Sequence, residues 1–411
     1  NRMGKSRSAR WLPTWNVSGA WNAHEEKFFS NLTSVLSHFT LKASYSLTAD
    51  RGPADVTNSQ AIITSYSPYR PFTYIKELEN SELTYEKKHE LNIGADMGFL
   101  NNRINLAVDW YKRNNYDLIG IVNTQGAGGQ ILKYANIASM KSHGIEFTLS
   151  TKNIKTKDFN WNTDFIFSNA KNEVTDLKQN ANVMELISGN GFAKQGYPVR
   201  GLFSIPFVGL DKDGIPVIIN EKGEATSTDI NFQERQNTGF LKYEGPTDPT
   251  ITGSLGNMFS YKGFRLNLFI TYSFGNVIRL NPVFKAYYSD LTAMTREFKN
   301  RWTLPGDEAK TNVPAILSKR MYDSNEDLKY AYNAYNYSTE RIAKGDFIRL
   351  KEISLAYDFP KAWINPLKLT DLSLKVQATN LFLIYADDKL NGQDPEFFNA
   401  GGVASPVPSQ F

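Results

Sequence analysis

Hydrophobic and polar residues alternate strictly along several long segments of this chain. In the clearest of them, Leu91 to Phe99, the odd positions hold Leu, Ile, Ala, Met and Phe, and the even positions hold Asn, Gly, Asp and Gly. A period of two residues is that of a β-strand whose two faces meet different surroundings. A turn at Asn101-Asn102 separates this segment from a similar one at 104–113. The two segments together predict a long β-hairpin.

The same alternation recurs along the rest of the chain. It is found at 15–21, 41–47, 145–149, 161–168, 265–274, 353–359 and 372–378. Several runs reach about ten residues, whereas strands of soluble sheets average about five or six. A strand needs about 9–11 residues to cross a lipid bilayer at a tilt. Length and phase therefore predict membrane-crossing strands, with an apolar face toward lipid and a polar face toward a wet interior.

The alternation assigns particular side chains to each face. The expected lipid face carries Trp15, Trp21, Leu91, Ile93, Trp110, Phe165, Leu268 and Tyr272. The expected interior face carries Asn92, Asp96, Asp109, Asp164 and Asn267. Because a shift of one residue exchanges the two faces of a strand, this assignment tests the predicted fold directly.

The connections between these strands fall into two length classes that alternate along the chain. Shorter connections are predicted at 23–38, 100–103, 152–158, 262–263 and 361–371. Long ones are predicted at 50–85, 115–142, 175–251, 280–345 and after 385. Outer-membrane barrels have short periplasmic turns and long extracellular loops. We therefore predict an all-β fold, a transmembrane antiparallel β-barrel with long extracellular loops, short periplasmic turns and about ten strands in this chain.

Plugged outer-membrane transporters have barrels of about 22 strands. An open sheet leaves unpaired backbone groups in lipid, so further strands must close the one predicted here. Residues 1–411 are accordingly expected to be the C-terminal portion of a single barrel domain. The first half of the barrel and its last strand are expected to lie outside this sequence.

Composition agrees with a membrane barrel and excludes other classes. Aromatic residues make up 13% of the chain and charged residues 21%, with a mean hydropathy of −0.42; a secreted β-sandwich shares these averages. No stretch reaches the ~18 apolar residues of a membrane-spanning helix, which excludes a helical membrane protein. The net charge of +4 comes from 46 basic and 42 acidic residues that are interspersed. This even distribution of charge excludes a nucleic-acid-binding surface.

The sequence offers little for catalysis or metal binding. It contains no cysteine, so thiol catalysis and cysteine-ligated metals are excluded. The four histidines, His24, His38, His89 and His143, lack the spacing of metal ligands. We expect no enzymatic activity, no cofactor and no metal.

Two acidic groups resemble parts of cation-binding loops. Asp211, Asp213 and Gly214 lack the later acidic ligands of a calcium loop, and a hairpin turn explains them better. Asp387, Asp388 and Asp394 leave open a cation site in an outer loop, as the minor alternative.

Aromatic residues in the predicted outer loops are the candidate ligand contacts. Amphipathic aromatic faces stack on sugar rings and clamp peptide side chains. The alternative is that they pack one loop against another or against a protein lid. The candidates, which are expected to be exposed, are Tyr66, Tyr69, Phe72, Tyr287, Tyr288, Trp302, Tyr330, Tyr332, Tyr335 and Tyr337.

A series of short motifs follows one order over almost the whole chain. They are Tyr85-Glu86-Lys87 through Asp117-Leu118 with the Gly98-Phe99-Leu100-Asn101-Asn102-Arg103 turn, Asn136 with His143-Gly144-Ile145-Glu146, Gly196-Tyr197-Pro198, Gly209-Leu210-Asp211, 345–351, 355–360, Gln377 with Asn380-Leu381-Phe382, and Asp394-Pro395-Glu396. In this order and spacing they resemble the SusC/RagA family of TonB-dependent transporters, found in the outer membrane of Bacteroidota.

This resemblance implies an importer of an oligosaccharide or oligopeptide. It also implies an N-terminal plug, energy supplied through a periplasmic contact with TonB, and a SusD-like lipoprotein lid outside. The plug and the TonB-contacting segment have no counterpart in 1–411. The alternatives are a barrel of this fold that acts as a structural scaffold in an outer-membrane assembly, and a secreted all-β enzyme such as a glycosidase. The lipid-like aromatic faces count against the enzyme.

Overall fold

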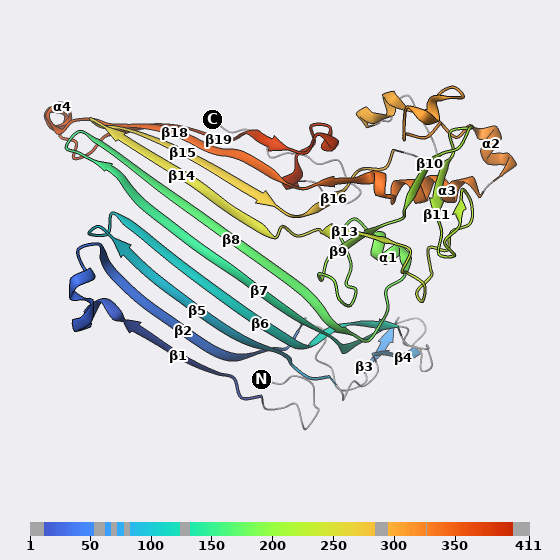
Figure 1. Ribbon diagram of the computed structural model, residues 1–411, viewed down its shortest axis with the longest axis horizontal. Helices are drawn as coiled ribbons and strands as arrows, with labels where there is room; N and C mark the ends of the chain where they lie inside the picture. The colour runs from blue at the N-terminus through green and yellow to red at the C-terminus, as the bar shows by residue number, and fades with distance from the viewer. Residues whose placement is uncertain are drawn as a thin grey trace.

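The computed structural model describes residues 12–52, 62–66, 72–77, 83–123, 132–283, 295–325 and 327–397. One antiparallel sheet of ten strands dominates it, and its strands lie side by side (Figure 1). In spatial order the strands are β1 (Trp15–Asn22), β2 (Leu36–Asp50), β5 (Glu86–Phe99), β6 (Ile104–Asn123), β7 (Leu132–Lys155), β8 (Phe159–Leu177), β14 (Ile251–Tyr261), β15 (Phe264–Phe274), β18 (Phe347–Asp358) and β19 (Ser373–Ala386). Spatial order follows chain order, which confirms the predicted all-β architecture of about ten strands.

The register of the strands places the predicted lipid-facing residues on one face. Directly paired residues of adjacent strands share a face, and Trp110 pairs with Ile93 on one side and Ile145 on the other. When the paired residues are followed from strand to strand, Trp15 at one edge of the sheet and Leu268 near the other edge lie on the same face. All eight expected lipid-face residues lie on this face, and all five expected interior residues lie on the opposite one, so the predicted phase is confirmed.

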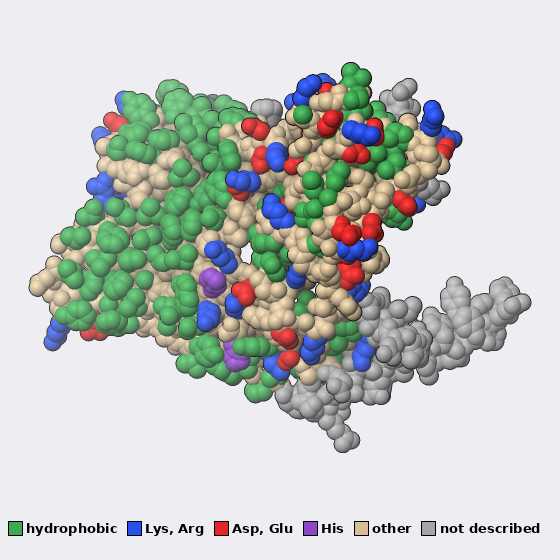
Figure 2. Space-filling model, turned by 45° about the vertical axis from the view of Figure 1, so that its right-hand side comes forward, with side chains coloured by type: hydrophobic (Ala, Val, Ile, Leu, Met, Phe, Trp, Pro, Cys, Tyr) green, Lys and Arg blue, Asp and Glu red, His purple; other side chains and the backbone are tan. Residues whose placement is uncertain are grey.

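The two faces differ in chemistry. Hydrophobic side chains cover much of the sheet in Figure 2, whereas charged side chains gather toward the connections at one end. On the interior face, Lys42 donates to Asp96 at 2.9 Å, and the Ser150 hydroxyl donates to Asp164 at 2.6 Å. Charged groups on this face therefore have polar neighbours, as a wet interior requires.

The shorter connections gather at one end of the sheet, beside α4 (Lys361–Ile364) and η7 (Asn365–Leu367) (Figure 1). The tightest of them is Lys262-Gly263, with φ of 47° and 90°. Positive φ at both central residues is the geometry of a type I′ turn, whose twist matches that of the strands it joins. The longer connection between β1 and β2 contains η1 (Ala23–Glu25) and η2 (Lys27–Leu32).

The predicted long connection at 115–142 is wrong over most of its length. Strand β6 continues to Asn123 and β7 begins at Leu132. The alternation is interrupted because the register shifts between Asn115 and Leu118, where Asp117 has a φ of 57°. A bulge of this kind adds a residue and breaks the two-residue period, although the strand continues beyond it. Residues 124–131, which join the two strands, lie outside the described residues.

The other long connections fold into small elements at the far end of the sheet (Figure 1). The connection after β2 contains β3 (Ile62–Tyr66) and β4 (Phe72–Glu77). Residues 178–250 contain α1 (Val183–Ile187), β9 (Gly201–Ser204), β10 (Phe207–Leu210), β11 (Pro216–Ile219), β12 (Ala225–Thr226) and β13 (Lys242–Pro246). Residues 275–346 contain β16 (Val277–Arg279), η4 (Arg296–Asn300), η5 (Asp307–Ala309), α2 (Lys319–Ser324), α3 (Leu328–Asn336), η6 (Thr339–Arg341) and β17 (Ile342–Lys344). After β19 come η8 (Asp388–Leu390) and η9 (Pro395–Phe397).

The main hydrophobic core lies in these connections and not in the sheet. Val183, Leu186 and Ile187 of α1 pack with Phe203 of β9 and Ile218 of β11, and each is at most 1% exposed. The sheet contributes few fully buried side chains because one of its faces is apolar and outward while the other faces the interior. No helix in the described ranges has the length and apolar character needed to cross a membrane.

One glycine in the sheet is held between two strands, and it gives a stability prediction. A Cβ on Gly253 would lie 2.1 Å from the Ile166 carbonyl oxygen and 2.3 Å from the Tyr272 hydroxyl, which donates to that same carbonyl at 2.9 Å. We expect Gly253→Ala to lower the free energy of unfolding by about 1–3 kcal/mol, because the backbone must shift. Urea titration of the folded full-length protein measures this.

Gly256→Ala in the same strand is the matched control. There the nearest atom, in the ring of Phe269, would lie 3.6 Å from the new Cβ. Alanine should leave stability unchanged or raise it by up to about 1 kcal/mol, since it restricts the unfolded chain. Equal destabilisation by both substitutions would show that the close contact at Gly253 is absent.

Candidate functional site

A two-part groove lies between the folded connections and the interior face of the sheet, at the ends of β14, β15 and β18 that are nearest these connections. Its first cavity has a volume of about 520 Å³ and its second about 480 Å³, and both are lined by Gly189, Asn190 and Arg279. We call the two together the connector groove. Ligand pockets usually have volumes of about 300–1,000 Å³, so each part has room for a segment of a small oligomer.

The interior face of the barrel sheet forms one wall of the first cavity. This wall includes Thr252 of β14, Thr271 and Ser273 of β15, and Lys351 of β18. The opposite wall comes from the connections, with Arg200, Thr247 and Asn276. The second cavity is more apolar and is lined by Met184, Phe192, Leu280, Pro282 and Tyr337, among others. The groove thus presents hydroxyl, amide and cationic groups beside an apolar compartment.

Helix α1 fixes the position of one rim of the groove. The Asn182 side chain accepts from the Glu185 amide, and the Glu185 carboxylate accepts from the Asn182 amide, which forms a capping box. The helix is anchored by its buried apolar residues and ends at Ile187. Gly189 and Asn190 follow directly and line both cavities.

Arg279 holds three segments together at the centre of the groove. It is 6% exposed, and its guanidinium donates to the carbonyls of Ser338 at 2.8 Å, Phe203 at 2.6 Å and Ile187 at 3.4 Å. Its Nε has no hydrogen-bond partner among the described residues. Burial lowers the pKa of Arg279 to about 9, although Glu244 nearby acts in the opposite direction.

Arg349 joins the sheet to the last connection beside the groove. It is 3% exposed and its Nη2 lies 2.5 Å from both carboxylate oxygens of Asp394. Its Nε lies 2.9 Å from Glu396, a residue that also accepts from Lys351 at 3.1 Å. The segment after β19 is thereby attached to the interior side of β18.

Two of the three carboxylates considered for a cation site, Asp387, Asp388 and Asp394, have other partners in the structure. Asp394 faces Arg349, while Asp387 accepts from the backbone amides of Lys344 and Lys389. The carboxylates of Asp387 and Asp394 are therefore directed at different partners. No group of three or more His, Asp or Glu side chains within the described ranges is arranged to hold a metal ion.

The first acidic group forms the hairpin turn expected of it. Asp211 accepts from the backbone amides of Asp213 and Ile215, each at 2.9 Å. Gly214 has a φ of 75°, and the turn joins β10 to β11.

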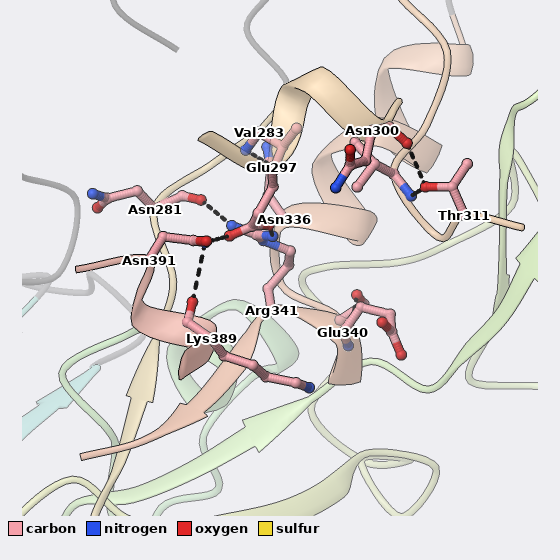
Figure 3. A network of polar contacts seen from close by, with 12 residues as sticks. Asn281, Val283, Glu297, Asn300, Thr311, Asn336, Glu340, Arg341, Lys389 and Asn391 are labelled. Atoms are coloured by element: carbon pink, nitrogen blue, oxygen red, sulfur yellow. Dashed lines mark hydrogen bonds and ion pairs between the residues drawn. The ribbon is translucent and has the colours of Figure 1, made fainter. Parts of the chain in front are cut away.

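A second buried arginine connects the other segments around the groove. Figure 3 shows Arg341 directed toward Glu297, with Asn391 bonded to the same carboxylate. Arg341 is 2% exposed and also donates to the Asn281 carbonyl at 2.6 Å. The network brings together η6, η4, the segment after β16 and the segment after β19. Together with the bonds of Arg279, this network joins the connections at 178–250, at 275–346 and after β19 into one hydrogen-bonded assembly.

Two of the predicted aromatic contacts are buried, so the exposure expected of them is wrong. Tyr332 and Tyr335 are each 1% exposed. Tyr332 donates to the Ala315 carbonyl at 2.9 Å, and the ring of Tyr335 packs edge-on against Phe207. Burial raises the pKa of Tyr335 to about 12. Both lie on the inward face of α3 with Leu328, and this helical spacing was visible in the sequence.

The other predicted aromatic residues have mixed positions. Trp302 is half-buried, donates to Glu308 at 2.9 Å and packs over Gly214, so it joins one loop to another. Tyr330 is exposed, and Tyr337 lines the second cavity. The remaining candidates give less information: Tyr66 and Phe72 pair across β3 and β4, while Tyr69, Tyr287 and Tyr288 lie outside the described residues.

The cationic residues of the groove were not identified from the sequence as candidates. Arg200, Arg279 and Lys351 belong to no chemical motif. Arg279 follows two apolar residues in a strand of three, and nothing local distinguishes it from a solvent-exposed arginine. Lys351 lies in the 345–351 motif, one of those that resemble the SusC/RagA family. That motif gives Lys351 no functional role.

The chain was compared with known proteins. No family model matches it. It is 24% identical over 404 residues to TonB-dependent receptor P3 of Formosa agariphila, covering 92% of this chain and 37% of the receptor. It is 26% identical over 440 residues to TonB-dependent receptor SusC of Bacteroides thetaiotaomicron, covering 98% of this chain and 39% of that protein.

The fold also matches solved structures. It superposes on a chain of the RagAB peptide transporter with a TM-score of 0.75 at 23% identity, covering 96% of this chain and 42% of that one. A structure of the RagAB peptide importer in an open-open state gives the same TM-score at 22% identity. The chain spans about two fifths of the length of the relatives it matches. In sequence and in strand phase, this chain matches part of the barrel of SusC/RagA-type TonB-dependent receptors of the outer membrane over most of its length.

Proposed function

We propose that the full-length protein imports an oligopeptide or oligosaccharide across the outer membrane, and that the connector groove is part of the path. The observation that carries this proposal is the position of the groove. Its first cavity opens at the interior face of a barrel sheet, beside the long connections, and is lined in part by polar and cationic side chains. A nutrient that enters the barrel from the loop side would meet these side chains.

An oligopeptide is the first substrate class to test. The structural relatives with a TM-score of about 0.75 are named as a peptide transporter or importer. The apolar second cavity and the hydroxyl-lined first cavity are compatible with peptide side chains and backbone amides. Sugar hydroxyls also hydrogen-bond to such walls, so oligosaccharides stay in the comparison.

The barrel requires further strands to close it. Strands β1 and β19 stand at the two edges of the sheet, and each pairs on one side only within the described residues. Unpaired strand edges are not tolerated in lipid. We therefore propose that 1–411 is the C-terminal portion of one barrel domain, completed by strands and a plug encoded elsewhere in the same protein.

Two partners follow from the same proposal. A SusD-like lipoprotein would cover the loop side, and exposed apolar side chains on the connections, such as Val208 and Leu304, support a protein partner there. TonB would contact the plug from the periplasm. The outer membrane has no nucleotide supply, so energy for import must arrive mechanically by this route, and the protein transports its ligand without altering it chemically.

The test is uptake by cells that carry the full-length protein. Candidate oligopeptides and oligosaccharides are supplied with the inner-membrane proton gradient intact or dissipated. We expect uptake that requires the gradient and returns the ligand chemically unchanged. Uptake that ignores the gradient would contradict active transport, and cleavage by the purified protein would contradict a purely transporting role. Failure to take up or bind any ligand would favour a scaffold.

Orientation in the membrane gives a separate prediction. We expect 50–85, 175–251 and 280–345 to lie outside the cell and the turns at Asn101-Asn102 and Lys262-Gly263 to face the periplasm. Protease added to intact cells should cut within the three long segments and spare the two turns. Disrupted cells provide the control, because both sides are then accessible. Cleavage of intact cells at the turns alone would invert the topology.

A further inference from the structure

We infer that the connector groove binds a carboxylate group of the transported nutrient, with Arg279 as the central cation. This inference rests on the proposed function, since it names the chemistry of the ligand at the same site. It goes further because it predicts a preference for anionic over neutral oligomers. The charged side chains around the groove differ in whether a nearby opposite charge neutralises them.

Most charged side chains at the groove have a partner of opposite sign. Arg200 pairs with Asp248 at 2.6 Å and Lys351 with Glu396 at 3.1 Å. The remaining pairs at or near the walls are Arg349 with Asp394, Arg235 with Glu185, and Lys242 with Glu244. Each of these pairs contributes little net charge to the groove.

Arg279 differs from all of these residues. Its three recorded acceptors are neutral backbone carbonyls, and no carboxylate lies within 4.0 Å of it among the described residues. Glu244, the carboxylate that acts on it from farther away, is itself paired with Lys242. A positive charge at the junction of the two cavities is therefore only partly compensated.

A buried charge without a counter-ion is costly, and proteins usually neutralise it with a nearby opposite charge. The lowered pKa of Arg279 agrees with this, because burial is its largest cause. A ligand carboxylate in the groove would supply the missing charge, because Arg279 lines both cavities. The side chains of Arg200 and Lys351 are partly exposed, and they can exchange their partners Asp248 and Glu396 for the same anion.

The carboxylate has two chemical sources. An oligopeptide carries one at its C-terminus or on an acidic side chain, and an oligosaccharide carries one on a uronic acid. The groove recognises the charge shared by both, and the ligand series below separates them.

The experiment measures binding by isothermal titration calorimetry to the purified full-length protein, with uptake by cells in parallel. The probes are a hexapeptide with a free C-terminal carboxylate, the same peptide amidated, an oligogalacturonate, and its methyl ester. We expect the anionic member of at least one pair to bind at least about tenfold more tightly than its neutral form, and the pair that shows the difference identifies the source.

Three variants connect the preference to the groove. Arg279→Met should reduce it to about threefold or less, and Lys351→Gln should weaken it in part. Lys222→Gln is the matched control, because Lys222 forms an exposed pair with Asp229 away from the groove lining. Arg279 also holds carbonyls, so its variant is first checked for native folding by heat-modifiable mobility. Should it misfold, the ligand pairs on the unaltered protein and Lys351→Gln still decide the question.

The outcomes separate the two proposals. Equal binding and uptake of the anionic and neutral forms would overturn the carboxylate inference and leave import standing. A preference that persists undiminished in folded Arg279→Met would also overturn it. Absence of binding and uptake for all four probes and for other oligomers would contradict import itself.

Discussion

Replacing Arg349 with methionine is expected to lower the free energy of unfolding by about 3–5 kcal/mol. Arg349 and Asp394 have side chains that are 4% and 7% exposed. Removing the guanidinium leaves the Asp394 carboxylate buried without its partner, and the unpaired charge dominates the loss. Urea titration of the full-length protein measures the global effect. Protease digestion of the segment after β19 measures local release, since this segment is attached to β18 through the pair.

The neighbouring Lys351→Met is the matched control for this prediction. Lys351 also pairs with Glu396, but both side chains are about one third exposed, and such pairs contribute about 0–1 kcal/mol. The double variant with Arg349→Met and Asp394→Leu should recover much of the stability, because it leaves no buried charge. If Arg349→Met were as mild as Lys351→Met, the pair would be solvated in the complete barrel.

The strands and their facing could be predicted from the sequence because they depend on a local pattern. Each strand alternates in a two-residue period, and pairing with its neighbours keeps that period in phase across the whole sheet. The prediction failed where the period was interrupted. The bulge at Asn115–Leu118 ended the pattern, and the strands beyond it were mistaken for a loop.

The candidate site was much less accessible to prediction. The position of Arg279 is fixed by hydrogen bonds to the carbonyls of Ile187, Phe203 and Ser338, which are up to 92 residues away along the chain. No local pattern reveals that a connection folds back onto a particular arginine. For Tyr332 and Tyr335 a local pattern was present and was not used. They were predicted to lie in an exposed loop, although their helical spacing with Leu328 favours a buried helix face.

The folded connections also affect what the barrel can do. Their core and the two buried arginines, Arg279 and Arg341, tie together segments that follow β8, β15 and β19. Such an assembly resists local unfolding because many buried contacts must break at once. The groove wall is therefore expected to keep its shape when ligand is absent, which lowers the entropic cost of binding.

Introducing a charge on the outer face of the sheet gives the second large effect. Leu268→Arg is expected to destabilise the folded barrel by about 2–4 kcal/mol, because it places a cation in the bilayer near the middle of a strand. Leu268 lies within Phe264–Phe274 and shares its face with Ile353 of β18. The measurement is urea-induced unfolding of the full-length protein in lipid vesicles, together with the fraction that inserts.

Asn267→Arg is the control at the adjacent position and the opposite face. Asn267 donates to Glu352 at 3.3 Å on the interior side, so an arginine there gains a carboxylate partner and stays in water. The two substitutions add the same side chain one residue apart. They differ only in the face that receives it, and Asn267→Arg should change stability by no more than about 1 kcal/mol. Similar losses for both would mean that the apolar face does not meet lipid, and the membrane-barrel interpretation of the alternation would then fail.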